Sequence, residues 1–104
     1  SIMSQITCDE ARTIVLARYY TEWEDIVTEP AVAEVGYENS DEWLMIVGAR
    51  EFIVGGDPNY RILDDAAYIV NKRTGQLEIT PMYLMSKDRY DSFVKYGTFP
   101  IWLQ

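Results

Sequence analysis

The apolar positions near the start of the chain recur at helical spacing. Residues 7–10 read Thr-Cys-Asp-Glu and match a capping box, in which the threonine and glutamate side chains bond amide groups of the first turn. From Cys8 onward, apolar residues follow at intervals of three and four. The pattern predicts a helix from Cys8 to about Glu22. An acidic loop follows and closes at Pro30, because proline disfavours a helical conformation in the residue before it.

The hydrophobic period then changes to two. Residues 31–38 alternate as in a half-buried strand, and Asn39-Ser40-Asp41 supplies the turn of a hairpin. The continuous apolar run 43–47 predicts a strand that is covered on both faces and lies centrally in the sheet. Residues 50–54 predict another short strand, ended by the Gly-Gly-Asp-Pro turn at 55–58. The following residues 60–63 carry no decisive pattern.

The second half of the chain contains a clear hairpin pattern. Apolar residues 67–70 and 77–79 flank a turn with Gly75, which can adopt the positive φ of a tight loop. Beyond Pro81, Ser86 caps a second short helix that we expect to stop at Gly97. The apolar tail 99–103 is expected to pack against the fold or to continue into a partner.

These elements predict an α+β fold in one domain. An N-terminal helix packs on a mostly antiparallel sheet of about four to six strands, and a short helix lies near the C-terminus. The length of 104 residues suits a single hydrophobic core. We expect Met3 to be the natural start behind a two-residue cloning remnant, so the domain spans residues 3–104.

The charge is polarised along the chain. Residues 1–66 carry fourteen acidic and four basic side chains, a net charge of −10, whereas residues 67–104 carry three acidic and five basic, a net charge of +2. A negative field repels nucleic acid and anionic lipid and accelerates association with basic proteins. The same charge can instead serve solubility alone. No apolar run approaches the roughly 20 residues of a membrane span, and the single cysteine fits a cytoplasmic protein.

Catalytic chemistry has little support in the sequence. The chain has no histidine, one cysteine, and serines without a nucleophile elbow, so we predict that it is not an enzyme. Cys8 near a helix N-terminus could be a reactive thiol, but no histidine can act as its base, and a packed apolar residue is the simpler interpretation. The acidic pairs at 24–25, 41–42 and 64–65 lack the spacing of metal loops. We predict neither metal nor cofactor.

Aromatic residues in loops or at element ends are the better candidates for contact with another protein, because exposed tryptophan and tyrosine commonly anchor interfaces. Acidic residues next to them would form a rim that suits a basic partner. The predicted partner-binding residues are Glu22, Trp23, Glu24, Asp25, Tyr60, Asp64, Asp65, Tyr83 and Trp102.

Three segments in this order resemble a known family. They are the tryptophan-led strand at 43–47, the glycine-aspartate turn at 56–57, and the hairpin 68–77, which reads Tyr-Ile-Val-Asn-Lys-Arg-Thr-Gly-Gln-Leu. The chain resembles the immunity protein 35 family, also described as YrhB-like domains, from about Asp9 to Tyr96. That family shares the N-terminal helix, a "V-x-[KR]-x-T-G-x-L" hairpin and a closing helix.

The resemblance implies a cytoplasmic immunity protein that neutralises a cognate toxin of a bacterial polymorphic or contact-dependent inhibition system. Such a protein masks the toxin's active or functional surface and has no catalytic residues. The alternative is a regulatory or small-ligand-binding module without catalytic activity, which a deep apolar pocket with convergent polar groups would favour.

Overall fold

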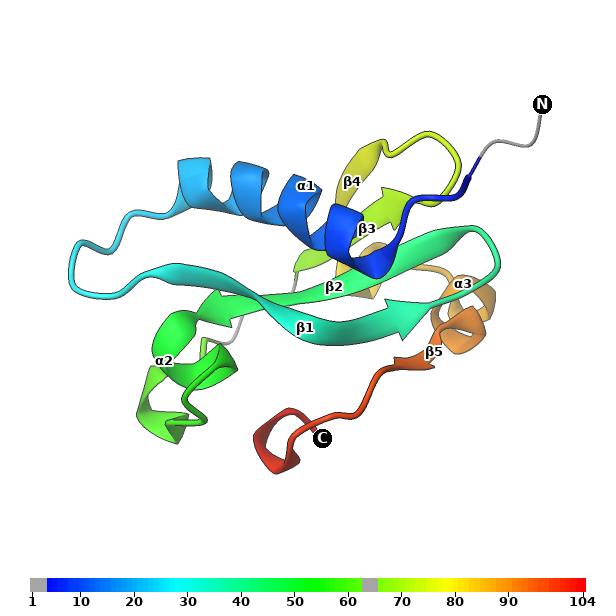
Figure 1. The fold of residues 1–104 in the computed structure, drawn as a ribbon. Helices are drawn as coiled ribbons and strands as arrows, with labels where there is room; N and C mark the ends of the chain where they lie inside the picture. Colours follow the sequence, from blue (N-terminus) through cyan, green and yellow to red (C-terminus); the bar gives the residue numbers. More distant parts are fainter. Residues whose placement is uncertain (1–3, 63–65) are drawn as a thin grey trace.

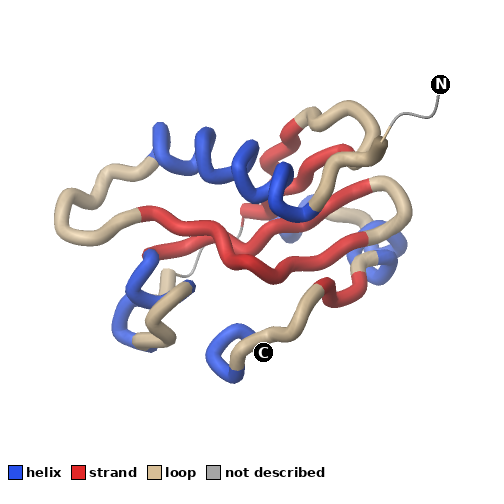
Figure 2. The backbone as a smooth tube through the Cα atoms, in the orientation of Figure 1, coloured by secondary structure: helices blue, strands red, loops and turns tan. Residues whose placement is uncertain are grey.

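One long helix packs across one face of an antiparallel sheet, and short elements cover part of the other face (Figures 1 and 2). The computed structural model of the protein describes residues 4–62 and 66–104. In chain order the elements are α1 (Cys8–Glu22), β1 (Pro30–Glu38), β2 (Glu42–Ala49), α2 (Arg50–Ile53), η1 (Pro58–Tyr60), β3 (Ala66–Asn71), β4 (Leu77–Pro81), η2 (Met82–Leu84), α3 (Lys87–Ser92), β5 (Val94–Tyr96) and η3 (Ile101–Leu103).

The helix α1 forms as its capping box predicts. The Thr7 hydroxyl accepts from the Glu10 amide at 3.2 Å, and the Glu10 carboxylate accepts from the Thr7 amide at 3.0 Å. The buried positions Cys8, Ala11, Val15 and Tyr19 follow the predicted spacing of three and four residues. This apolar stripe turns one side of α1 onto the sheet.

The sheet has five strands in the order β4-β3-β2-β1-β5, all paired antiparallel. The predicted α+β class and the central position of the 43–47 strand are therefore confirmed. Between α1 and the sheet lies the main core, to which Trp43, Met45, Tyr68 and Val70 contribute from β2 and β3. A second, smaller core on the opposite face contains Ala33, Val35, Ile53 and Phe99, among others.

The prediction of a strand at 50–54 is wrong, because Arg50–Ile53 forms the short helix α2. β2 loses its partner where β1 begins at Pro30, which pairs with Ala49. The chain then turns, and the Arg50 amide donates to the Glu29 carbonyl at 2.8 Å. The helical turn places Ile53 in the second core, beneath the sheet.

The hairpin of β3 and β4 is confirmed. The Asn71 side-chain oxygen accepts the amides of Arg73 and Thr74, each at 2.9 Å, and Gly75 adopts a φ of +75°. Lys72 is buried behind this turn, where its ammonium group lies 2.7 Å from a Glu38 carboxylate oxygen and 4.5 Å from the Trp43 ring centre. The lysine of the hairpin motif thus fastens the β3–β4 turn to β1 and β2.

The last third of the chain differs from prediction at one point. The helix capped by Ser86 does not continue to Gly97 but ends at Ser92, and residues 94–96 form β5 beside the end of β1. Valine and tyrosine favour a strand, and β1 offers an open edge there. Gly97, with φ +88°, turns the chain away from the sheet. The expected packing of the tail holds for Phe99, which is buried, whereas Ile101 is exposed.

Candidate functional site

The loop that joins α1 to β1 carries the densest group of predicted contact residues. We call residues 22–29 the acidic loop; it forms the end of the molecule at the left of Figure 1. Within it, the Asp25 carboxylate accepts from the Val27 amide at 2.8 Å and from the Thr28 hydroxyl at 3.0 Å. The Val27 bond, and then the Thr28 bond, lower the pKa of Asp25, so this side chain is ionised and holds the loop in a defined turn.

Trp23 fixes the same loop from the inside. Its indole N–H donates to the Thr28 carbonyl at 3.0 Å, and its ring packs on the main core 5.5 Å from the Tyr19 ring centre. Trp23, which was predicted to contact a partner, is therefore half-buried and mainly holds the loop in its conformation. Two independent anchors, Trp23 and Asp25, meet at Thr28.

The acidic loop presents two aliphatic side chains that sequence reasoning missed. Ile26 is 98% exposed and Val27 is 82% exposed. Apolar side chains that stay in water contribute no burial energy to folding, so their exposure favours a role in binding. Because the loop is already held in one conformation, it loses little conformational entropy when a partner binds. A usable signal was present in the sequence: two aliphatic residues stand between Asp25 and Thr28, which together favour a side-chain-bonded turn.

Acidic residues flank this aliphatic pair in the sequence. Glu22 ends α1, where it accepts from Arg18 at 2.6 Å, and Glu24 is exposed in the loop. Glu29 lies 3.4 Å from Arg50 of α2, so the loop is also linked to the next layer of the fold. The acidic loop thus combines two exposed aliphatic side chains with several neighbouring acidic residues, a combination that suits an apolar patch with lysine or arginine nearby.

The other predicted contact residues lie on separate parts of the surface. Tyr60 ends η1, and Trp102 packs against Gly56 and donates its indole N–H to the Ile53 carbonyl at 3.1 Å. Tyr83, in η2 directly after β4, is 78% exposed. Asp64 and Asp65 lie outside the described residues. The described members thus do not form one continuous group, and Glu22, Trp23, Glu24 and Asp25 are the ones that the fold brings together.

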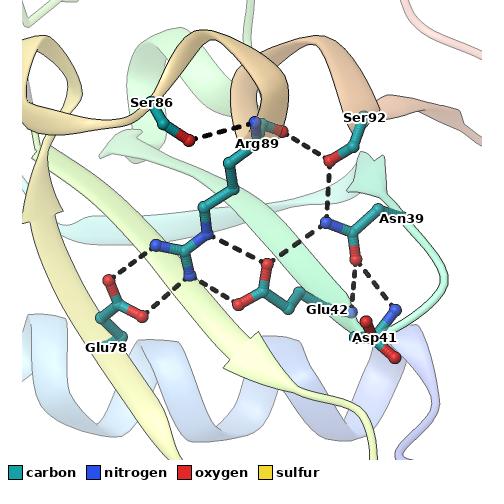
Figure 3. A network of polar contacts seen from close by, with 7 residues as sticks. All are labelled: Asn39, Asp41, Glu42, Glu78, Ser86, Arg89 and Ser92. Atoms are coloured by element: carbon teal, nitrogen blue, oxygen red, sulfur yellow. Dashed lines mark hydrogen bonds and ion pairs between the residues drawn. The ribbon is translucent and has the colours of Figure 1, made fainter.

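A second polar cluster lies on the face of the sheet that is turned away from α1 (Figure 3). Arg89 of α3 lies between two carboxylates, with Nη2 2.5 Å from Glu42 and 2.8 Å from Glu78. Asn39 bonds both Glu42 and Ser92. Hydrogen bonds from Arg89 lower the pKa of Glu78. Because these groups satisfy one another, the cluster holds α3 on the sheet and leaves no donor directed at a ligand among the residues drawn in Figure 3.

Two further features bear on small-molecule chemistry. A cleft of about 300 Å³ lies on the partly covered sheet face, lined among others by Ile46, Phe52 and Met82, and its Arg61 and Gln104 side chains are exposed. The cleft is at the lower end of ligand-site volumes, and these polar side chains do not converge in a buried position. Burial raises the pKa of the Cys8 thiol, which is the opposite of what a reactive cysteine requires.

Across residues 4–62 and 66–104, no group of acidic, histidine or cysteine side chains has a geometry that could hold a metal ion. In the same part of the chain, no helix has the length and apolar character needed to cross a bilayer. No family model matches the chain, and no match is found among curated proteins or among solved structures.

Proposed function

We propose that this protein is an immunity protein, which binds a cognate bacterial toxin domain and neutralises it by masking a surface that the toxin needs. The proposal rests on the resemblance at 43–47, 56–57 and 68–77 and is carried by one observation. In the acidic loop Ile26 and Val27 are almost fully exposed, and carboxylate residues precede and follow them in the chain.

The acidic loop suits this role because it is ordered before any partner arrives. Asp25 and Trp23 fix its backbone through their bonds to Val27 and Thr28, so little conformational entropy remains to be lost on binding. Ile26 and Val27 would enter an apolar depression on the toxin. The neighbouring carboxylates would pair with basic residues at its rim, which accelerates association more than it strengthens the complex.

The decisive experiment measures binding to a specific probe. The probe is the C-terminal domain of a large secreted protein, where the reading frame immediately upstream encodes one. We expect tight binding by titration calorimetry and loss of toxin activity in the complex. The double substitution Ile26→Asp and Val27→Asp should raise Kd by roughly 100-fold, as expected for two central apolar anchors. Val94→Asp, which changes an exposed aliphatic side chain on β5, is the matched control.

The electrostatic part has its own readout. Glu22→Gln with Glu24→Gln should lower the association rate constant at low salt and have little effect at high salt, because screening removes long-range attraction. Asp25 is left intact since it supports the turn. Absence of binding by the unmodified protein would overturn the proposed function. Tight binding that ignores the Ile26 and Val27 substitutions would instead place the contact elsewhere on the molecule.

A further inference from the structure

Residues 98–104, which we call the strap, come after β5 and pack on the second core, on the sheet face that is turned away from α1 (Figure 1). Phe99 is the buried anchor of the strap, with 8% of its surface exposed, and it lies in the second core with Val35 and Ile53. Leu103 packs against the same core and is partly buried. Two apolar side chains four residues apart therefore seat the strap.

Hydrogen bonds contribute little to this seat. The backbone bonds of the strap are internal, as in the bond from the Leu103 amide to the Pro100 carbonyl at 3.0 Å. Between the strap and the other described residues there is one hydrogen bond, which the Trp102 indole N–H donates to the Ile53 carbonyl at 3.1 Å. The strap can therefore leave its seat without breaking the hydrogen bonds of the sheet.

The glycine-aspartate turn at 56–57 makes room for the Trp102 ring. A Cβ atom at Gly56 would lie 2.8 Å from Trp102 Cδ2, and the φ of Gly56 is +72°. Glycine satisfies both conditions because it has no Cβ and tolerates a positive φ. This turn, which stands out in the sequence, is thus part of the seat of the strap.

Two clefts indicate that the strap fills its seat only in part. The cleft of about 300 Å³ described above and a second cleft of about 250 Å³ are both lined by Ile53, Trp102 and Leu103. The first continues along β2 and β3, and the second along residues 32–35 of β1. We call the two clefts and the seat between them the strap groove. Apolar walls that face an unfilled space lack the contacts that a larger occupant would make.

We propose that the strap groove binds an extended apolar segment of a partner protein, which displaces the strap and occupies its anchor positions. The strap itself indicates the chemistry of that segment: an aromatic residue at the Phe99 position and an aliphatic residue four positions later. An aromatic ring suits the first position because the Tyr37 ring meets Phe99 edge-on at 5.4 Å, and the Lys95 ammonium group lies 5.0 Å from the Phe99 ring centre. The strap acts as a built-in competitor that covers the groove in the absence of the partner.

This groove is separate from the acidic loop. No residue of that loop lines either cleft, and the inference does not depend on the proposed function. A covered groove has a lower apparent affinity for an outside segment, because only the fraction of molecules with an open groove can bind it. Weakening the strap should therefore strengthen binding of the outside segment, a response that an ordinary apolar surface would not give.

The test measures binding of a synthetic peptide that has the sequence of residues 97–104 and a blocked amino terminus. Its affinity for the unmodified protein should be low, because the tethered strap competes at an effective concentration on the order of 1 mM. Phe99→Ala in the full chain should lower the peptide Kd by roughly 100-fold, since the competitor loses its buried anchor. Trp102→Phe removes only the indole donor and should lower the Kd by roughly fivefold. Ile101→Ala, at a strap residue that is 87% exposed, is the matched control and should leave the Kd unchanged.

Trp102→Phe keeps the buried anchor, so this variant stays informative even where Phe99→Ala lowers stability. Indole hydrogen exchange in the unmodified protein supplies a second readout. The Trp102 N–H should exchange through an opening that is insensitive to low denaturant, whereas the Trp43 N–H, which donates to the Ile6 carbonyl at 2.7 Å, should exchange through global unfolding. Saturating peptide should accelerate exchange at Trp102 alone. Identical denaturant dependence at the two indoles, or a peptide Kd that is the same for Phe99→Ala, Trp102→Phe and Ile101→Ala, would rule out a displaceable strap.

Discussion

Replacing Arg89 with methionine should destabilise the protein by about 2.5 kcal/mol. The Arg89 side chain is 27% exposed, and its partners Glu42 and Glu78 are 18% and 46% exposed. The two-point contact with the more buried Glu42 contributes about 2 kcal/mol, since its loss leaves a half-buried carboxylate without a cation. The contact with Glu78 is more exposed, and solvent screening reduces it to about 0.5 kcal/mol. For a domain of this size the sum lowers Tm by roughly 10 °C.

Thermal unfolding followed by circular dichroism measures this loss. The matched control is Lys87→Met, which removes the more exposed ion pair of Lys87 with Asp91 on the same helix and should cost below about 0.5 kcal/mol. Arg89→Lys keeps the charge but not the fork of donors, and we expect an intermediate Tm. Equal Tm values for Arg89→Met and Lys87→Met would refute the assignment of Arg89 as the anchor of α3.

The same contact makes a signed prediction about pH. Arg89 lowers the pKa of Glu78 below its ordinary value of 4.5. A carboxylate with a lowered pKa in the folded state stabilises the protein above the unfolded pKa, and this contribution is lost as the pH falls through the folded pKa. The difference in stability between the unmodified protein and Arg89→Met should therefore shrink as the pH is lowered from 6 to 3. A constant difference over that range would contradict the electrostatic explanation.

Three further outcomes follow from contacts elsewhere in the fold. Lys72→Met leaves Glu38 without its buried cation and should cost about 3 kcal/mol in urea unfolding; an unchanged midpoint would refute that. Gly97→Ala should cost about 1 to 3 kcal/mol, because φ is +88° and the new Cβ would lie 2.8 Å from Val35 Cγ1, and calorimetry should show a lower Tm. Asp25→Ala should accelerate hydrogen exchange of the Val27 amide, which donates a hydrogen bond to the Asp25 carboxylate in the unmodified protein. Since the pKa of Asp25 is lowered, the unmodified loop should approach the variant's exchange behaviour only as the pH falls below the ordinary aspartate value of 3.8.

Those elements that could be predicted from the sequence are the ones whose local pattern agrees with their tertiary surroundings. The capping box at Thr7 begins α1 because its partners are three residues apart, so nothing distant is needed. The turn at Gly75 is equally local, since Asn71 bonds the next amides directly. In strand β2 the uninterrupted run of apolar residues indicates by itself that both faces of the strand are covered.

The two errors in secondary structure have a non-local origin. Residues 50–54 have strand composition, but whether β2 continues depends on where β1 begins, and Pro30 begins it opposite Ala49. Residues 94–96 become β5 because β1 has an open edge at Gly36. Neither fact is contained in a local window, because each depends on a strand about 20 to 60 residues away.

The candidate site was predictable in charge but not in shape. Acidic residues at the end of α1 indicate a negative surface wherever the loop lies, and the sequence carries that information directly. The exposure of Ile26 and Val27 depends on the turn that Asp25 and Trp23 impose, and apolar residues are assigned to a core by default. Trp23 was singled out for exposure and lies half-buried, since its ring packs beside Tyr19.

The strand order β4-β3-β2-β1-β5 has a kinetic consequence. The pairs β1–β2 and β3–β4 are joined by short turns, whereas β5 lies near the end of the chain and pairs with β1 at residues 36–38. Contacts that close long loops form late in folding, and they are lost first when a protein opens locally. We therefore expect the segment after Pro81 to be the last to dock and the first to detach. Its departure would uncover the apolar side of the sheet while the hairpins and α1 stay intact.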